Sequence, residues 1–369
     1  MLAAAVRIGH TLAAECSHEG AAAGTMRLSA INKLAMRLGR TAVRLLRDVP
    51  NWPGEYFGAP PIVVLSFNRP HYLRPTLESL RQQEPGIDPD RVHLFQDGAV
   101  NRYSGVRYAD DGAIEACVAL LKEIFPRGHV HASTANIGTC ENFLRAERFA
   151  FKTLKAPVAY FFEDDLVLSP HYVAALDVLR RALCGRRVGY FNACGSFGSP
   201  LAEQSARHDQ LIDMGHLWGF GLKRSHWLAM QPRLTPYHAL VVGRDYRQGP
   251  RDAIQAYFRT LGLSMEATSQ DAAKVLVTQS LGSWQASTFP CFARYIGKEG
   301  LHFTEAKFER YGLHNTVVYP DPLREVRVSR QAIRSGLKNR RRAFKRLLRA
   351  HLRREQRRAE AASQTARQA

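Results

Sequence analysis

The sequence has few cysteines, and nothing in its spacing brings them together. Six cysteines are spread over 369 residues, without a CxxC pair or a Cys/His cluster at the spacing of a zinc site. We therefore expect reduced thiols, as in a cytoplasmic protein, and no structural zinc. Long apolar runs are also missing. No stretch reaches the roughly 20 residues that cross a bilayer, and the apolar residues near the N-terminus are too interrupted for a secretory signal.

Acidic residues are scarce, with 33 Asp and Glu against 52 Lys and Arg. The excess is local, because residues 26–47 carry +6 and residues 334–358 carry +11 of the total of +19, which leaves +2 for the rest. A near-neutral middle argues against a nucleic-acid partner, although the basic arms keep a nucleic-acid-binding protein as an alternative.

Both basic arms space their apolar residues as an amphipathic helix does, over residues 27–46 and 334–358. A basic helix with one apolar stripe suits an anionic membrane surface. We therefore expect a cytoplasmic protein that can dock at the inner face of the membrane, with a solvated tail as the alternative.

Short apolar runs alternate with helical patterns between residues 61 and 185. Strands are expected at residues 62–65, 92–95, 130–132 and 158–162, and helices at 113–125 and 138–152. Two further helices are expected: one with Pro75 in its first turn, and one capped by Ser169 that begins at Pro170. This alternation predicts an α/β fold, Rossmann-like, with a mostly parallel central sheet between helices.

The chain divides into four parts. We assign residues 1–60 to a basic extension and linker, 61–185 and 186–325 to the two halves of the α/β domain, and 326–369 to a basic helical tail.

Polar residues follow each expected strand. In a parallel sheet the ligand binds outside the carboxyl ends of the strands, so these residues should meet in one crevice. They are Ser66, Asn68 and Arg69, then Asp97, then Asn136 and Gly138, and finally Glu163, Asp164 and Asp165.

Three adjacent acids after a buried strand repel one another. A divalent cation removes this repulsion, and oxygen ligands without a nearby cysteine suit Mn²⁺ or Mg²⁺. The alternative is an acidic loop that interacts with the dipole of the following helix.

Five segments, in order, resemble the GT-A glycosyltransferases. PIVVLSFNRPHYLRPTLESL is similar to their first strand and helix, and HLFQDG to their second nucleotide-contacting strand end. YFFEDDLVLSPHY resembles the acidic DXD-type motif, in the EDD version of the N-acetylglucosaminyltransferase I family. GHLWGFGLKRSHW and PCFARYIGKEGLHFT resemble that family's acceptor-side and closing segments, so the likeness spans about residues 61–304.

The resemblance implies that residues 61–185 form a nucleotide-sugar-binding half and residues 186–325 an acceptor-binding and catalytic half. It also implies roles for the nucleotide-side residues. Ser66, Asn68 and Arg69 would border the nucleotide, and Asp97 would hydrogen-bond the base. Asp164 would face the ribose or donor sugar with Glu163 beside it, and Asp165 would bind the metal. Asn136 and Gly138 belong to a partial match to an NxGxxxARN-like segment, and a simple turn is the alternative.

An inverting transferase needs a carboxylate that takes the proton of the acceptor hydroxyl. Asp271, ahead of the closing segment, is the expected base; Asp245 is the alternative base, and an N-cap is the alternative role for Asp271. His302 would complete the metal shell or lie in a loop. Trp218, with Gly219, would present a ring to the acceptor or belong to the core.

These patterns together predict a hexosyl- or N-acetylhexosaminyltransferase. The expected donor is a nucleoside diphosphate sugar, most simply a UDP-sugar, and the acceptor is a glycan or a lipid-linked glycan. A sugar nucleotidyltransferase is a weaker alternative, because the GxGTR-like loop of that class is missing after the first strand. A sugar-binding pseudoenzyme stays open.

Overall fold

The computed structural model describes residues 53–263, 267–300 and 303–368. The helix expected at residues 27–46 lies outside them. Among the described residues, no helix combines the length and apolarity needed to cross a membrane.

One sheet of eight strands forms the centre of the molecule, in the order β3-β2-β1-β4-β8-β6-β9-β7. Six of these strands run in one direction, while β8 and the edge strand β7 run against them. The expected α/β architecture with a mostly parallel sheet is confirmed. The strands are β1 (Ile62–Ser66), β2 (Val92–Gln96), β3 (His129–Ala132), β4 (Val158–Glu163), β6 (Val188–Asn192), β7 (Leu211–Asp213), β8 (Phe220–Lys223) and β9 (Trp284–Thr288). A second, two-stranded sheet pairs β5 (Leu166–Leu168) with β10 (Ala293–Tyr295).

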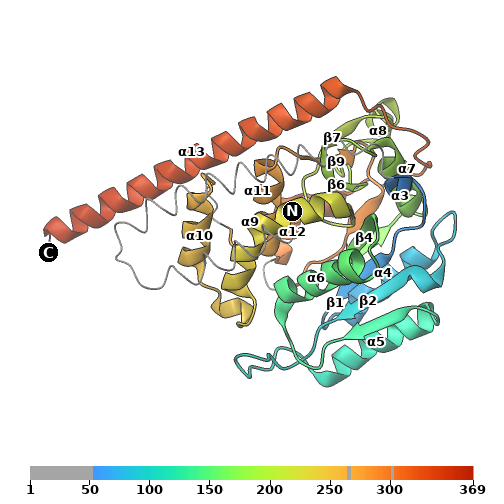
Figure 1. The fold of residues 1–369 in the computed structure, drawn as a ribbon, viewed down its shortest axis with the longest axis horizontal. Helices are drawn as coiled ribbons and strands as arrows, with labels where there is room; N and C mark the ends of the chain where they lie inside the picture. Colours follow the sequence, from blue (N-terminus) through green and yellow to red (C-terminus); the bar gives the residue numbers. More distant parts are fainter. Residues whose placement is uncertain (1–52, 264–266, 301–302, 369) are drawn as a thin grey trace, which may run out of the picture.

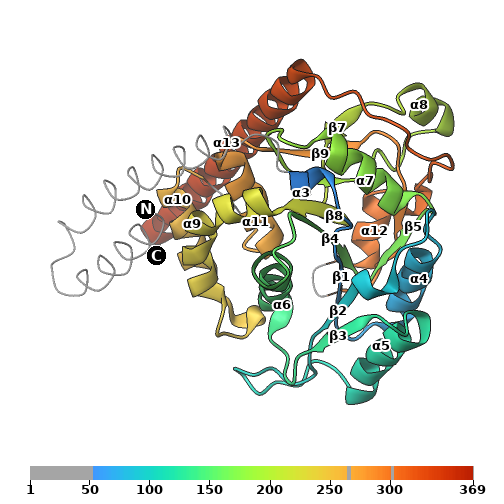
Figure 2. The ribbon, with the colours of Figure 1, turned by 45° about the vertical axis from the view of Figure 1, so that its right-hand side comes forward.

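Helices cover both faces of the main sheet, as Figures 1 and 2 show. On one face pack α4 (Pro70–Arg81), α5 (Asp111–Ile124), α7 (Tyr172–Ala182) and α12 (Glu305–Arg310). On the other pack α6 (Gly138–Arg148), α9 (Arg224–Val241), α10 (Arg251–Thr260) and α11 (Gln270–Ser280). The remaining helices are α3 (Pro53–Tyr56), α8 (Leu201–Ala206), the long α13 (Arg330–Gln368), the π-helix η2 (Phe149–Thr153) and the short 3-10 turns η1 (Pro89–Arg91), η3 (Tyr246–Gln248) and η4 (Leu313–Asn315).

Strand β1 shows why its residues are apolar without a break. Ile62 and Val64 point into the core on the α4 and α5 face, while Val63 and Leu65 point into the core under α6 and α11. A strand buried on both faces needs apolar side chains at every position, which is the pattern of a parallel sheet.

Two expected helix starts are wrong. Helix α4 begins at Pro70, whose missing N–H costs nothing at a first helical position, and Pro75 lies inside the helix. Helix α7 begins at Tyr172 after His171, because the Ser169 N–H donates to the Phe292 carbonyl at 2.7 Å and continues the bonding of the small sheet.

The basic tail is a helix, as expected, and its first turns are docked on the domain. Ile333 is buried, and a Cβ on Gly336 would lie 2.3 Å from the Trp284 ring. Arg340 donates to the Met214 carbonyl at 2.7 Å. Figure 1 shows the rest of α13 running away from the sheet.

Candidate active site

Three acids follow the central strand β4. Glu163 is its last residue, and Asp164 and Asp165 form the turn into β5. Glu163 is half-buried and the other two are buried. The Thr76 hydroxyl of α4 lies 3.0 Å from the Asp164 carbonyl oxygen and accepts from the Leu166 N–H at 3.2 Å. Helix α4 therefore holds the acids at the carboxyl edge of the sheet.

Arg69, at the end of β1, lies against these acids. Its Nη2 hydrogen-bonds Asp164 and lies 2.9 Å from Asp165 Oδ2, and its Nη1 donates to the Glu299 carbonyl at 2.9 Å. Burial alone would lower the pKa of Arg69, but the charges of Asp164 and Asp165 outweigh it and raise that pKa. The positive charge that balances the acids therefore comes from within the protein.

The remaining acids resist ionisation. Burial raises the pKa of Glu163 well above its usual range, and the charges of Asp165 and Asp271 add to this effect. Burial, followed by the charge of Asp164, raises the pKa of Asp165 to about 6, with Arg69 opposing. Carboxyl groups that hold a proton near neutral pH in a cleft are typical of functional sites.

Arg69 lies where the expected divalent cation would neutralise the acids. Among the described residues, no three His, Cys, Asp or Glu side chains converge on a point that could hold a metal. Asp165 Oδ2 faces Arg69, and Asp165 Oδ1 is buried without a hydrogen-bond partner. His302, expected in the metal shell, lies outside the described residues. The described geometry assigns charge compensation to Arg69.

Asp97, after β2, holds the neighbouring loop. Its Oδ1 accepts from the N–H groups of Gly98 and Ile137, each at 2.9 Å. Its Oδ2 accepts from Asn136 Nδ2 and the Gly138 N–H, each at 3.0 Å. Because each oxygen already accepts two hydrogen bonds, a nucleotide base would have to displace one of these donors.

The other nucleotide-side residues lie at the same edge. Ser66 is buried at the end of β1, and its carbonyl accepts from the Asp97 N–H at 3.0 Å. Asn68 is half-buried next to Arg69. Gly138 has a φ of 78° and begins α6, so it needs the conformational freedom of glycine.

Asp271 is brought to the acids from far along the chain. It is the second residue of α11, and its negative charge acts on Glu163. The N-cap of α11 is Ser269, which accepts from the Ala272 N–H at 3.3 Å, so the alternative N-cap role for Asp271 is wrong. Burial raises the pKa of Asp271, as suits a base that must take a proton near neutral pH.

Asp245, the alternative base, is engaged elsewhere. Its Oδ2 accepts from the hydroxyls of Ser104 and Tyr108 at 2.5 and 2.6 Å, and its Oδ1 accepts from the Arg247 N–H at 3.0 Å. Asp245 therefore anchors loops.

Trp218 does not present a free ring face. One face stacks on His216, with ring centroids 4.0 Å apart, and the other on Tyr295, at 4.2 Å. Gly219 is buried, with a φ of 50°, and a Cβ there would lie 2.8 Å from the Tyr172 hydroxyl. An acceptor could therefore meet only the edge of the Trp218 ring, and Gly219 allows close packing.

Comparisons with known proteins leave the family open. A scan against protein-family models found no match, and a search of curated proteins found no relative. The functional assignment depends on the site itself.

Two residues of the closing segment belong to the site, although their sequence context gave no sign of it. The Tyr295 hydroxyl lies beside Asp165 and helps to lower its pKa against the effect of burial. A Cβ on Gly297 would lie 2.4 Å from Asp165 Oδ2 and 2.6 Å from the Tyr295 hydroxyl, so any side chain there would displace both. The segment PCFARYIGKEG carried a resemblance as a whole, and only the fold shows which of its residues touch the acids.

Proposed function

We propose that the protein is a glycosyltransferase with a GT-A type of fold. It transfers a sugar from a nucleoside diphosphate sugar, most simply a UDP-sugar, to a glycan or glycolipid acceptor. The supporting observation is that the charge of the half-buried Asp271 acts on Glu163, while Arg69 pairs with Asp165, at the carboxyl edge of the sheet.

In this proposal each charged group has a separate task. Asp271 takes the proton of the acceptor hydroxyl, whose oxygen then attacks the anomeric carbon of the donor sugar. The bond from that carbon to the diphosphate breaks, and its electron pair leaves with the diphosphate. Attack from the face opposite the leaving group inverts the anomeric configuration. Arg69 supplies positive charge to the crevice in which the diphosphate lies.

A thermal-shift panel tests donor binding. Nucleoside diphosphates and their sugars are compared in EDTA and in Mn²⁺, with UDP as the first probe. A ligand at about 100 times its Kd stabilises the folded state by about 2.7 kcal/mol, so the midpoint should rise by several degrees. The EDTA and Mn²⁺ arms also test the expected cation. If no nucleotide raises the midpoint under either condition, the proposed function is wrong.

Turnover separates an enzyme from a pseudoenzyme. A sugar-nucleotide-binding pseudoenzyme would give the same thermal shifts but would release no UDP from a UDP-sugar with any acceptor. A product with the same anomeric configuration as the donor would contradict the inverting mechanism.

The proposal includes a membrane surface as a partner. In the described part of α13 beyond Arg340, basic side chains such as Arg346, Arg349 and Arg353 are exposed. Each basic residue near an anionic bilayer contributes on the order of 1 kcal/mol. Docking through this helix would bring the enzyme to a lipid-linked acceptor.

A further inference from the structure

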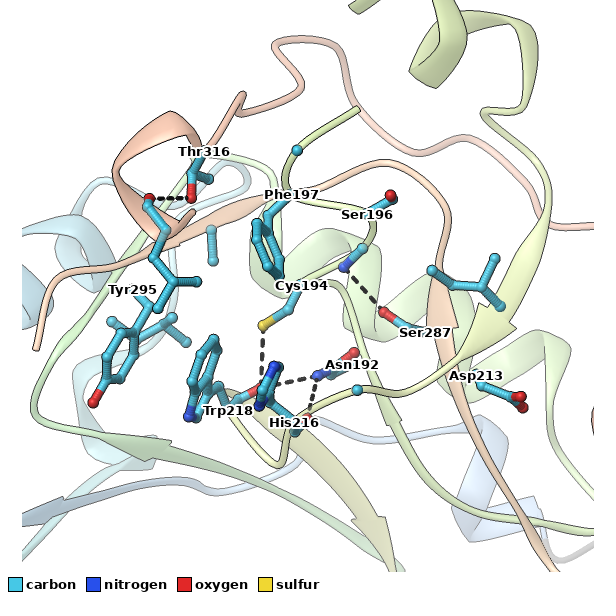
Figure 3. Close-up of a pocket in the computed structure, with 17 residues that line it drawn as sticks. Asn192, Cys194, Ser196, Phe197, Asp213, His216, Trp218, Ser287, Tyr295 and Thr316 are labelled. Atoms are coloured by element: carbon cyan, nitrogen blue, oxygen red, sulfur yellow. Dashed lines mark hydrogen bonds between the residues drawn. The ribbon is translucent and has the colours of Figure 1, made fainter. Parts of the chain in front are cut away.

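A cavity of about 230 Å³ lies beside the acids, at the carboxyl ends of β6 and β9. Figure 3 shows this cavity and its lining side chains. Since a water molecule occupies ~30 Å³ of liquid, the space corresponds to roughly seven waters. It can take one small ring.

The stacked rings of Trp218 and Tyr295 connect this cavity to the acids. Both side chains line it, and the Tyr295 hydroxyl lies on the side of Asp165, where a Cβ on Gly297 would touch both groups. A ligand in the cavity would therefore lie next to the reaction centre, while the Trp218–Tyr295 pair would separate it from Arg69.

Asn192 supplies a buried acceptor without a donor. The side chain is 1% exposed, and its Nδ2 donates to the carbonyl oxygens of His216 and Trp218 at 3.0 and 3.1 Å. These two bonds fix which end of the amide is nitrogen. Figure 3 shows the oxygen on the opposite side, and among the described residues Asn192 Oδ1 has no hydrogen-bond partner. A buried carbonyl oxygen of this kind favours a ligand that brings an O–H or N–H group.

The other lining groups suit an uncharged ligand. No lysine or arginine is among the described residues that line the cavity. Its one acid, Asp213, already accepts a hydrogen bond from the Trp284 indole, and burial lowers the pKa of His216. Hydroxyl groups of Ser196 and Ser287 add neutral polar contacts, and the Phe197 ring adds an apolar one. Mixed hydroxyl and aromatic lining matches the two kinds of surface on a sugar ring.

We propose that this cavity binds one uncharged sugar ring of the acceptor, with a ring hydroxyl donating to Asn192 Oδ1. The assignment rests on the proposed function, which places the donor diphosphate with Arg69 on the other side of the Trp218–Tyr295 pair. It makes the residues from Asn192, at the end of β6, to Gly198 determinants of acceptor specificity.

Two glycines provide a matched test. Gly198 lines the cavity, and a Cβ built on it meets nothing within 4 Å. Gly112, in α5, has the same open surroundings but lies away from the cavity. Gly198→Leu should therefore fill the cavity mouth without a clash, while Gly112→Leu controls for the added side chain. Gly215, which also lines the cavity and has open surroundings, offers Gly215→Leu as a second blocking variant if the first does not fold.

Binding is measured on the full chain, with saturating UDP, by saturation-transfer NMR. The probes are methyl glycosides of glucose, galactose, mannose and N-acetylglucosamine. We expect at least one glycoside to bind the parent and the Gly112→Leu variant, and to bind the blocked variant at least tenfold more weakly. Among mono-deoxy analogues of that glycoside, loss of one hydroxyl should weaken binding about tenfold, because Asn192 Oδ1 would again lack a donor.

The outcomes separate this inference from the proposed function. UDP binding with no glycoside signal, or with a signal that the blocked variants retain, overturns the acceptor cavity and leaves the transferase proposal standing. Glycoside binding by the parent that the blocked variants lose, without any nucleotide binding, supports the cavity and contradicts the transferase.

Discussion

Replacing Arg69 by methionine should destabilise the fold, because it removes the positive charge between Asp164 and Asp165. The Asp165 side chain is 3% exposed and that of Arg69 is 22% exposed. Removing one partner of a buried pair costs about 3–5 kcal/mol, and the partial exposure of Arg69 favours the lower value, about 3 kcal/mol. Unfolding roughly 270 residues at ~2.1 cal/mol/K each gives an entropy of about 0.6 kcal/mol/K. The midpoint of thermal unfolding should therefore fall by about 5 °C.

The loss of stability in Arg69→Met should increase as the pH rises. Arg69 favours the ionised form of Asp165, so the pKa of Asp165, about 6 in the parent, must be higher in Arg69→Met. Between these two pKa values the folded parent binds fewer protons than the folded variant. The difference in the free energy of unfolding between parent and variant therefore grows as pH rises through that interval. The difference in midpoint should be larger at pH 8 than at pH 5.

Calorimetry on the full chain provides the measurement, with Arg74→Met as the control. Arg74 pairs with Glu123 at 2.8 Å, but both side chains are about half exposed, so its loss should cost less than about 1 kcal/mol. Equal midpoints for the two variants, or a deficit in Arg69→Met that does not change with pH, would refute the role of Arg69. Recovery of the lost stability by Mn²⁺ in Arg69→Met alone would show that Arg69 occupies the place of a cation.

Three further predictions concern the base, the nucleotide loop and the tail. Asp271→Asn should lower turnover by about 10²–10⁴-fold with donor affinity unchanged, and unchanged turnover would move the role to Asp245. The base acts in its ionised form, and burial raises the pKa of Asp271 above the usual aspartate range. In the parent, kcat/KM should therefore fall as the pH decreases through that raised pKa. Gly98→Ala should lower the free energy of unfolding in urea by about 1–3 kcal/mol, because its Cβ would lie 2.4 Å from the facing backbone. Gly112→Ala, which has open surroundings, should not lower this free energy. Deleting residues 334–369 should abolish sedimentation with anionic vesicles; equal sedimentation of both forms would contradict the membrane surface.

The main strands were predictable because each is a local pattern. The residues of β1, β2 and β4 are mostly apolar, since helices cover both faces of the sheet. The order of polar groups at the strand ends follows from parallel direction alone, so the meeting of Arg69, Asp97 and the three acids at one edge could be expected. Helix starts were less predictable, because proline and serine suit several turn positions equally well.

By itself, the sequence determined a mostly parallel α/β sheet and the edge at which the acids lie, because both depend on residues close together in the chain. The partners of those acids were decided by the tertiary structure. Strand β8 inserts between β4 and β6, which places Trp218 and Asn192 beside the acids. Strand β10 and the loop after it bring Tyr295 and Gly297 to Asp165. The contacts of Tyr295 and Gly297 with Asp165 join residues more than 100 positions apart. No local periodicity or spacing encodes them, because they depend on how the whole sheet is ordered.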